Sequence, residues 1–133
     1  MTYLLDTNAC IRYLNGQASS LRQRLIETDP RDIVLCSIVK AELYHGALKS
    51  ARPRENLTKL RKFFLPFVSL GFDDDVAMTY GEIRVDLEST GQIVGPNDLL
   101  IAAIARTYEL TLVTHNTREF SRVKGLNLDD WEA

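Results

Sequence analysis

The sequence lacks the features that define several large classes of protein. Its two cysteines, Cys10 and Cys36, are too few for a disulfide framework, and they lie in apolar stretches without the spacing of a zinc site. No apolar run approaches the ~18 residues of a membrane-spanning helix, so we expect no contact with a membrane. The N-terminus has no basic segment followed by an apolar one, so we expect no signal peptide and a cytoplasmic protein.

Length and composition are those of an ordinary globular protein. The 133 residues are close to the common size of one domain, so we expect a single domain over residues 1–133. With 45% hydrophobic and 26% charged residues, the composition excludes a disordered chain. The net charge of −2 gives no general attraction for nucleic acid.

Charge is unevenly distributed along the chain. The segment 40–62 is mainly basic and the segment 73–88 is mainly acidic. A local basic stretch is typical of a surface that binds phosphate, although a solvated helical hairpin would look the same. The basic residues are Lys40, Lys49, Arg52, Arg54, Lys59, Arg61 and Lys62.

Short apolar runs alternate with segments of helical pattern. We expect strands at 2–6, 33–36, 67–72, 110–114 and 127–131, and helices at 8–15, 19–27, 37–50, 53–65, 73–90 and 96–108. Ser37 and Asp73 are the expected N-caps of two of these helices. Strands that alternate with helices predict an α/β protein with three layers (α/β/α) around a central, mainly parallel sheet of four or five strands.

Acids and amides occur where helices and strands are expected to end. They are Asp6, Glu42, Asp98, Asn116 and Glu119. In an open α/β sheet the ligand crevice lies beyond the carboxyl ends of the strands, so these side chains are expected to converge. Oxygen ligands of this kind suit Mg²⁺ or Mn²⁺, and together with a basic surface they point to metal-assisted chemistry on a phosphate-bearing substrate.

Each of these residues also has an ordinary structural interpretation. Asp6 would be an N-cap, although Thr7 or Asn8 would also serve. Glu42 would form an ion pair with Lys49, and Asp98 would interact with a helix dipole. His45 is expected to be a structural histidine rather than a ligand or base, His115 to face solvent, and Asp73-Asp74-Asp75 to cap a helix rather than bind metal.

Four motifs carry a resemblance to a known family. They are Leu4-Leu5-Asp6-Thr7-Asn8; Ser37 with Glu42-Leu43 and Gly46-Ala47; Gly95-Pro96-Asn97-Asp98 with Ile101-Ala102; and Val113-Thr114, Asn116-Thr117 and Glu119-Phe120. In this order they resemble PIN domains, and among them the VapC toxins of prokaryotic toxin–antitoxin modules.

The resemblance implies a metal-dependent endoribonuclease that hydrolyses a phosphodiester of structured RNA by water attack. Asp6, Asp98 and Glu42 would hold Mg²⁺, or Mn²⁺ in its place, and Thr7 would steady the first carboxylate. The fourth acidic position of the family is occupied here by Asn116, with Glu119 as its possible substitute. The basic residues Lys49, Arg52, Arg54 and Lys59 would contact RNA.

The resemblance also implies partners. These are a VapB-like antitoxin that blocks the acidic site, a second copy of the chain in a homodimer, a toxin–antitoxin hetero-oligomer, and operator DNA reached only through the antitoxin. Initiator tRNA is one candidate RNA target. Two alternatives stay open: a PIN-fold module that binds RNA or a partner without catalysis, and a phosphoacceptor signalling domain. The latter would need a carboxylate pair where Thr7-Asn8 stands.

Overall fold

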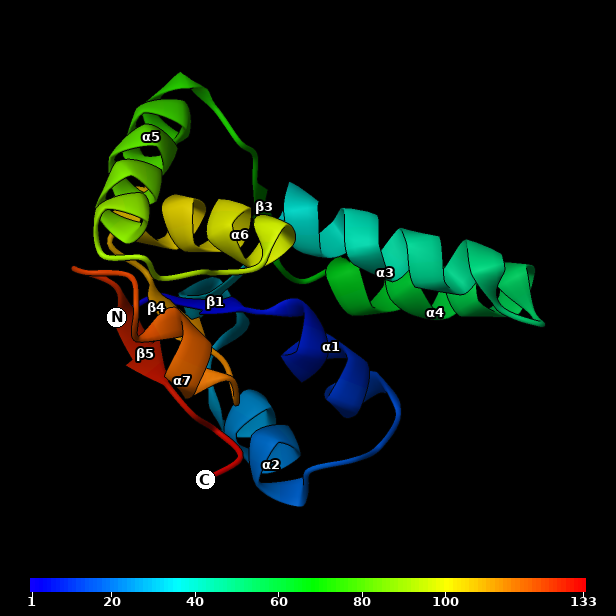
Figure 1. Ribbon diagram of the computed structural model, residues 1–133. Helices are drawn as coiled ribbons and strands as arrows, with labels where there is room; N and C mark the ends of the chain where they lie inside the picture. The colour runs from blue at the N-terminus through cyan, green and yellow to red at the C-terminus, as the bar shows by residue number, and fades with distance from the viewer.

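The computed structural model describes residues 1–133 and places five strands in one parallel sheet (Figure 1). The strand order is β3-β2-β1-β4-β5. The strands are β1 (Tyr3–Leu5), β2 (Ile33–Cys36), β3 (Val68–Leu70), β4 (Thr111–Val113) and β5 (Asn127–Asp129). The expected mainly parallel sheet is confirmed, and all five expected strands are present.

Helices cover both faces of this sheet, which confirms the expected three layers (Figure 1). Helices α5 and α6 pack against each other on one face, α1 and α2 lie on the other, and α3 and α4 form a hairpin that projects away from the sheet. The bounds are α1 (Thr7–Leu14), α2 (Ser19–Glu27), α3 (Ser37–Lys49), α4 (Pro53–Phe64), α5 (Asp74–Ser89), α6 (Pro96–Thr107) and α7 (Thr117–Phe120), with a short 3₁₀ helix, η1 (Pro30–Asp32). None of these helices combines the length and apolarity that crossing a membrane requires.

The starts of three helices, α4, α5 and α6, follow from local chemistry. Asp73 caps α5, because its Oδ1 accepts a hydrogen bond from the N–H of Val76 at 2.9 Å. Pro53 and Pro96 stand at the first positions of α4 and α6, where the missing proline N–H has no cost. The expected cap at Ser37 is wrong: Ser37 is already helical, and its hydroxyl donates to the carbonyl of Leu70 at 3.4 Å.

The core joins the middle strands to α6. All four residues of β2 are buried, as are Leu112 and Val113 of β4. On α6, Ala102, Ala103 and Ala105 are fully buried. Such small side chains let the helix axis lie close to its neighbours, which brings the first turn of α6 near the strand ends.

The strand order places the chain's topological switch point between β1 and β4. From β1 the chain proceeds to β2 and β3 on one side, and it then returns past β1 to β4 and β5 on the other. Crossovers that leave in opposite directions open a crevice beyond the carboxyl ends of the two strands. The residues that follow these ends are Asp6 and Thr114, and the N–H of Asp6 bonds to the carbonyl of Val113 at 3.1 Å.

Candidate active site

Asp6 is fixed at the head of this crevice. It is 4% exposed, its Oδ1 accepts a 2.8 Å hydrogen bond from the N–H of Ala9, and the Thr114 hydroxyl donates to its carboxylate. Asp6 therefore does cap α1, against the expectation that Thr7 or Asn8 would make the cap unnecessary. Capping and a place in the crevice are compatible, because a carboxylate has about four lone-pair sites. Burial raises the pKa of Asp6, and the bonds from Thr114 and Ala9 partly offset that rise.

Glu42 reaches the same crevice from α3. Its Oε1 accepts a hydrogen bond from the Thr7 hydroxyl at 2.5 Å, and it is half-buried. The alternative of an ion pair with Lys49 is wrong, because no cation lies within 4.0 Å of Glu42. The expected role of Thr7 is also corrected: it holds Glu42, whereas Thr114 steadies Asp6.

Asp98 stands in the first turn of α6 and meets Glu119 from α7. Their carboxyl groups are hydrogen-bonded to each other, and Glu119 Oε1 also accepts from the N–H of Gly95 at 2.7 Å. A Cβ at position 95 would lie 3.4 Å from Glu119 Oε1 and 3.6 Å from Asp98 Oδ2. A side chain there would thus be in ordinary van der Waals contact with both carboxyl groups, and Gly95 contributes to the site through its N–H donor to Glu119.

Asn116 positions Glu119. Its Nδ2 donates to Glu119 Oε2 at 2.7 Å, and its backbone N–H bonds to the Thr114 hydroxyl oxygen at 3.0 Å. The side-chain amide of Asn116 thus points its donor at the acid that contacts Asp98. Of the two candidates for the fourth position, Glu119 is the one whose carboxyl group meets the other acids.

Four acids consequently share one crevice without a basic partner. None of the ion pairs in the structure includes Asp6, Glu42, Asp98 or Glu119. Burial, followed by the negative charges of Glu119, Asp6 and Glu42, raises the pKa of Asp98 to about 7. The N–H of Gly95 lowers the pKa of Glu119. Such a set of carboxylates suits a hard divalent cation, which would remove their mutual repulsion.

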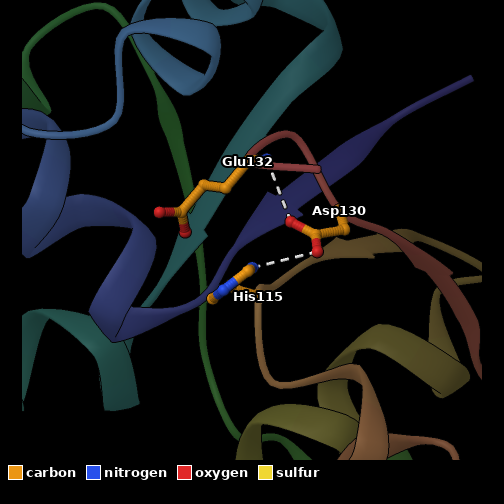
Figure 2. A group of neighbouring side chains, drawn as sticks. All are labelled: His115, Asp130 and Glu132. Atoms are coloured by element: carbon orange, nitrogen blue, oxygen red, sulfur yellow. Dashed lines mark hydrogen bonds and ion pairs between the residues drawn. The ribbon is translucent and has the colours of Figure 1, made fainter.

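A second cluster lies beside the crevice. Figure 2 shows His115, Asp130 and Glu132, whose ligand atoms lie within 4.8 Å of one another, a spacing that the crevice acids do not match. His115 is exposed as expected, but its Nδ1 also bonds to Asp130 Oδ2 at 3.0 Å. Glu132 forms an ion pair with Arg12.

The remaining candidates lie outside the crevice. Lys49, Arg52, Arg54 and Lys59 are exposed on the α3–α4 hairpin. His45 is exposed and makes no side-chain hydrogen bond, so a structural role for it is not supported. Asp73 caps a helix as expected. Cys10 and Cys36 are buried free thiols, and no disulfide joins them.

Gly95 and Thr114 belong to the motifs quoted from the sequence, but their contacts were not predicted. The structure shows that Gly95 bonds to Glu119 and that Thr114 bonds to Asp6. The ion pair of Arg12 with Glu132 was not predicted either, because it joins residues 120 positions apart in the sequence.

Known proteins with similar sequences and structures identify the family to which this crevice belongs. The family model for the PIN domain matches residues 3–126. Ribonuclease VapC2 of Rickettsia felis is 39% identical over 133 residues, with 99% of each chain covered, and the tRNA(fMet)-specific endonuclease VapC of Shigella flexneri is 38% identical over 131 residues, with 98% of each covered. The crystal structure of VapBC2 from Rickettsia felis, bound to a DNA fragment from its promoter, matches with a TM-score of 0.92 and 39% identity over 98% of this chain and 99% of that one.

The chain therefore belongs to the PIN-domain family and, within it, to the VapC-type toxins of toxin–antitoxin modules. Its enzymatic class is that of the nucleases, which are hydrolases. Nucleases with this domain generally depend on a divalent metal ion, a requirement that the four-acid crevice fits.

Proposed function

We propose that the protein is a Mg²⁺-dependent endoribonuclease that acts as the toxin of a VapBC-type system and cleaves structured RNA. The observation that carries this proposal is the crevice at the β1–β4 switch point, where four carboxyl groups converge without a basic partner. The names of the relatives, ribonuclease and tRNA(fMet)-specific endonuclease, support RNA as substrate and initiator tRNA as the first target to test.

Asp6, Asp98 and Glu42 would hold the cation, and Glu119 would take the fourth position. Bound Mg²⁺ would supply positive charge at the scissile phosphate and a water of lowered pKa. The chain itself orients the ligands: Ala9 and Thr114 fix Asp6, and Thr7 fixes Glu42. Ligands held by second partners in this way lose little freedom when the ion binds.

The proton shared by Asp98 and Glu119 would compete with the cation for these carboxyl groups. With the pKa of Asp98 at about 7, this carboxyl group is half-protonated near neutral pH. A divalent cation binds the ionised form, so binding releases the proton. Mn²⁺, which accepts similar oxygen ligands, is expected to substitute for Mg²⁺.

Affinity for RNA would come from the basic hairpin. Lys49, Arg52, Arg54 and Lys59 are exposed, and Lys59 also lines a groove of about 310 Å³ that reaches Glu42. Contacts between such residues and phosphates give affinity without reading sequence and weaken with salt. Selection of one RNA would then depend on its loops and unstacked bases.

The partners in this proposal are a VapB-like antitoxin and a second copy of the chain. The VapBC complexes among the similar structures support the antitoxin, and the DNA-bound ones support operator contact through it. The groove between α1 and the α3–α4 hairpin has apolar walls at Ile11, Leu14 and Leu60 and ends at Glu42. An antitoxin segment placed there would cover the acidic crevice. The cytoplasm is the compartment that fits an RNA substrate.

The test is cleavage of total RNA and purified tRNAs by the chain freed of antitoxin. Reactions with Mg²⁺ and with EDTA would compare wild type, Asp6→Asn and Asp98→Asn, with Asp32→Asn as a control at an exposed site. We expect Mg²⁺-dependent fragments with 5′-phosphate and 3′-hydroxyl ends that persist only in wild type and the control.

Two results would count against the proposal. Fragments with 2′,3′-cyclic phosphate ends would show attack by the RNA's own 2′-hydroxyl rather than by water. RNA binding without any cleavage, equal in wild type and the acid variants, would favour the module that binds RNA without catalysis.

A further inference from the structure

A hollow of about 420 Å³ lies next to the acidic crevice. It is lined by Asn8, Ile11, Arg12, His115 and Asn116, of which only Ile11 is apolar. Two of these residues connect it to the crevice. Asn116 donates to Glu119, and Asn8 directly follows the threonine that holds Glu42. A strand whose scissile phosphate lies among the acids would therefore pass this hollow with a neighbouring nucleotide.

The side chains that line the hollow carry hydrogen-bond donors without protein partners. Arg12 bonds to Glu132 through Nε, and neither of its Nη atoms makes a hydrogen bond. His115 is held through Nδ1, which leaves Nε2 without a partner. The amide of Asn8 also makes no hydrogen bond and is exposed. A guanidinium, an imidazole and an amide in one hollow form a set that recognises phosphate oxygens.

The C-terminal turn holds the two strongest of these donors in place. Glu132, with a side chain only 6% exposed, is the anchor of Arg12, whose side chain is 41% exposed. Asp130, which anchors His115, is itself fixed because its Oδ1 accepts from the N–H of Glu132 at 2.9 Å (Figure 2). Donors that are already oriented lose less side-chain entropy when a ligand arrives.

The same cluster has the composition of a metal site, but its contacts favour an anion. A cation bound by His115, Asp130 and Glu132 would have to displace the guanidinium of Arg12 from Glu132 and would lie beside that positive charge. The two carboxylates are largely covered, whereas Arg12 and His115 line the hollow and are more exposed. A ligand that enters from solvent thus meets the donors first.

We propose that this hollow is a subsite for the RNA strand, in which Arg12 and His115 bind a backbone phosphate next to the scissile one. The proposal rests on the proposed ribonuclease function and adds a contact outside the basic hairpin. In it, Asp130 and Glu132 act as positioning residues for the two donors.

Binding without cleavage tests the subsite directly. The full chain would be titrated in EDTA into fluorescently labelled, unfractionated tRNA at several salt concentrations, and anisotropy would give Kd. The variants are Arg12→Gln, His115→Gln and Arg12→Lys, with Arg31→Gln as a matched control. Arg31 is also paired with a carboxylate, Asp29, but it lies in η1 and does not line the hollow.

We expect Arg12→Gln and His115→Gln each to weaken binding by about five- to tenfold, and Arg31→Gln to leave it unchanged. Loss of one phosphate contact should also reduce the slope of log Kd against log salt by about 0.7–0.9 for Arg12→Gln. Arg12→Lys keeps a cation beside Glu132, so it should preserve the fold, but it lacks the planar guanidinium. Its affinity for tRNA should lie between that of wild type and that of Arg12→Gln.

Failure of the subsite and failure of the proposed function give different results. If wild type binds and cleaves RNA and all the variants bind equally well, the hollow is not a subsite and the nuclease stands. If wild type neither binds nor cleaves RNA, the proposed function itself fails. A calorimetric titration with Zn²⁺ that saturates in wild type and is lost in His115→Gln would assign the cluster to a cation and overturn the phosphate subsite.

Discussion

The carboxyl groups of Asp98 and Glu119 are hydrogen-bonded to each other, although they come from different helices, α6 and α7. Such a bond requires one proton, and the pKa of Asp98, raised to about 7 by burial and by the charge of Glu119, favours Asp98 as the group that carries it. The pair thus binds a proton in the absence of a cation. Because that proton is lost as the pH rises, the stability of the metal-free protein should depend on pH.

Asp98→Asn should stabilise the metal-free protein in alkaline solution. The pKa of Asp98 rises from 3.8 to about 7 on folding, so ionisation costs stability as pH rises through that window, and the cost is complete above it. In EDTA the variant should melt several degrees above wild type at pH 8 and close to it at pH 4, as followed by circular dichroism. Mg²⁺ should raise the melting temperature of wild type more than that of the variant. Equal melting temperatures at pH 8 would contradict the buried, repelled carboxylate.

Thr7→Val should reduce cleavage by about tenfold without unfolding the protein, because it removes the hydrogen bond that orients Glu42. The Mg²⁺ concentration at half-maximal rate should rise at the same time, and Thr7→Ser should restore both values. Thr107→Val is the matched control, since the Thr107 hydroxyl donates to the carbonyl of Ala103 in the last turn of α6. If Thr7→Val cleaves RNA as fast as the control, the orientation of Glu42 by Thr7 does not contribute to catalysis.

Glu119→Gln should reduce the rate of RNA cleavage more than Asn116→Ala does. Glu119 contacts Asp98 directly, whereas Asn116 acts through its bond to Glu119. We expect the rate of RNA cleavage to fall about a hundredfold in Glu119→Gln and about tenfold in Asn116→Ala. Asn127→Ala, at an exposed position on the edge strand, should leave it unchanged. The reverse order would assign the fourth position of the site to Asn116.

Gly95→Ala should leave both the fold and the cleavage rate close to those of wild type. The backbone φ of Gly95 is −55°, which alanine adopts freely, and the new Cβ would lie in ordinary van der Waals contact with Glu119 Oε1 at 3.4 Å, while the N–H that bonds to Glu119 is kept. Gly81→Ala is the control, because a Cβ there meets nothing within 4 Å and should stabilise α5 by about 0.5–1 kcal/mol. Melting curves and cleavage rates of the two variants, measured side by side, provide the check, and a loss of activity in Gly95→Ala alone would contradict the expected room for a Cβ.

The sequence predicted the order of strands and helices because their signals are local. The apolar run Ile33–Cys36 and the prolines at 53 and 96 each define an element without distant contacts. The strands were predicted a residue or more too long in four of five cases, since apolar residues such as Phe67 and Leu110 contact the core beyond the last strand bond. Helix α7 has only four residues and no cap bond, so it gave no pattern to detect.

The acids of the candidate site were also identified in the sequence, but their interactions were not. Asp6 and Asp98 stand next to the ends of elements, as expected, whereas Glu42 lies inside α3. Whether Glu42 bonds to Lys49 or to Thr7 depends on how α3 lies against α1, which no spacing within α3 reveals. The same holds for Asp98 and Glu119, whose contact requires α6 and α7 to meet.

The strand order also has a consequence during synthesis. Asp6 is made before the segment that completes its crevice, because the crevice forms only when β4 pairs with β1 and is followed by α7. A nascent chain whose β4 and α7 are still inside the ribosome has neither Thr114 to hold Asp6 nor Glu119 to meet Asp98. The four acids therefore cannot gather until α7 has left the ribosome.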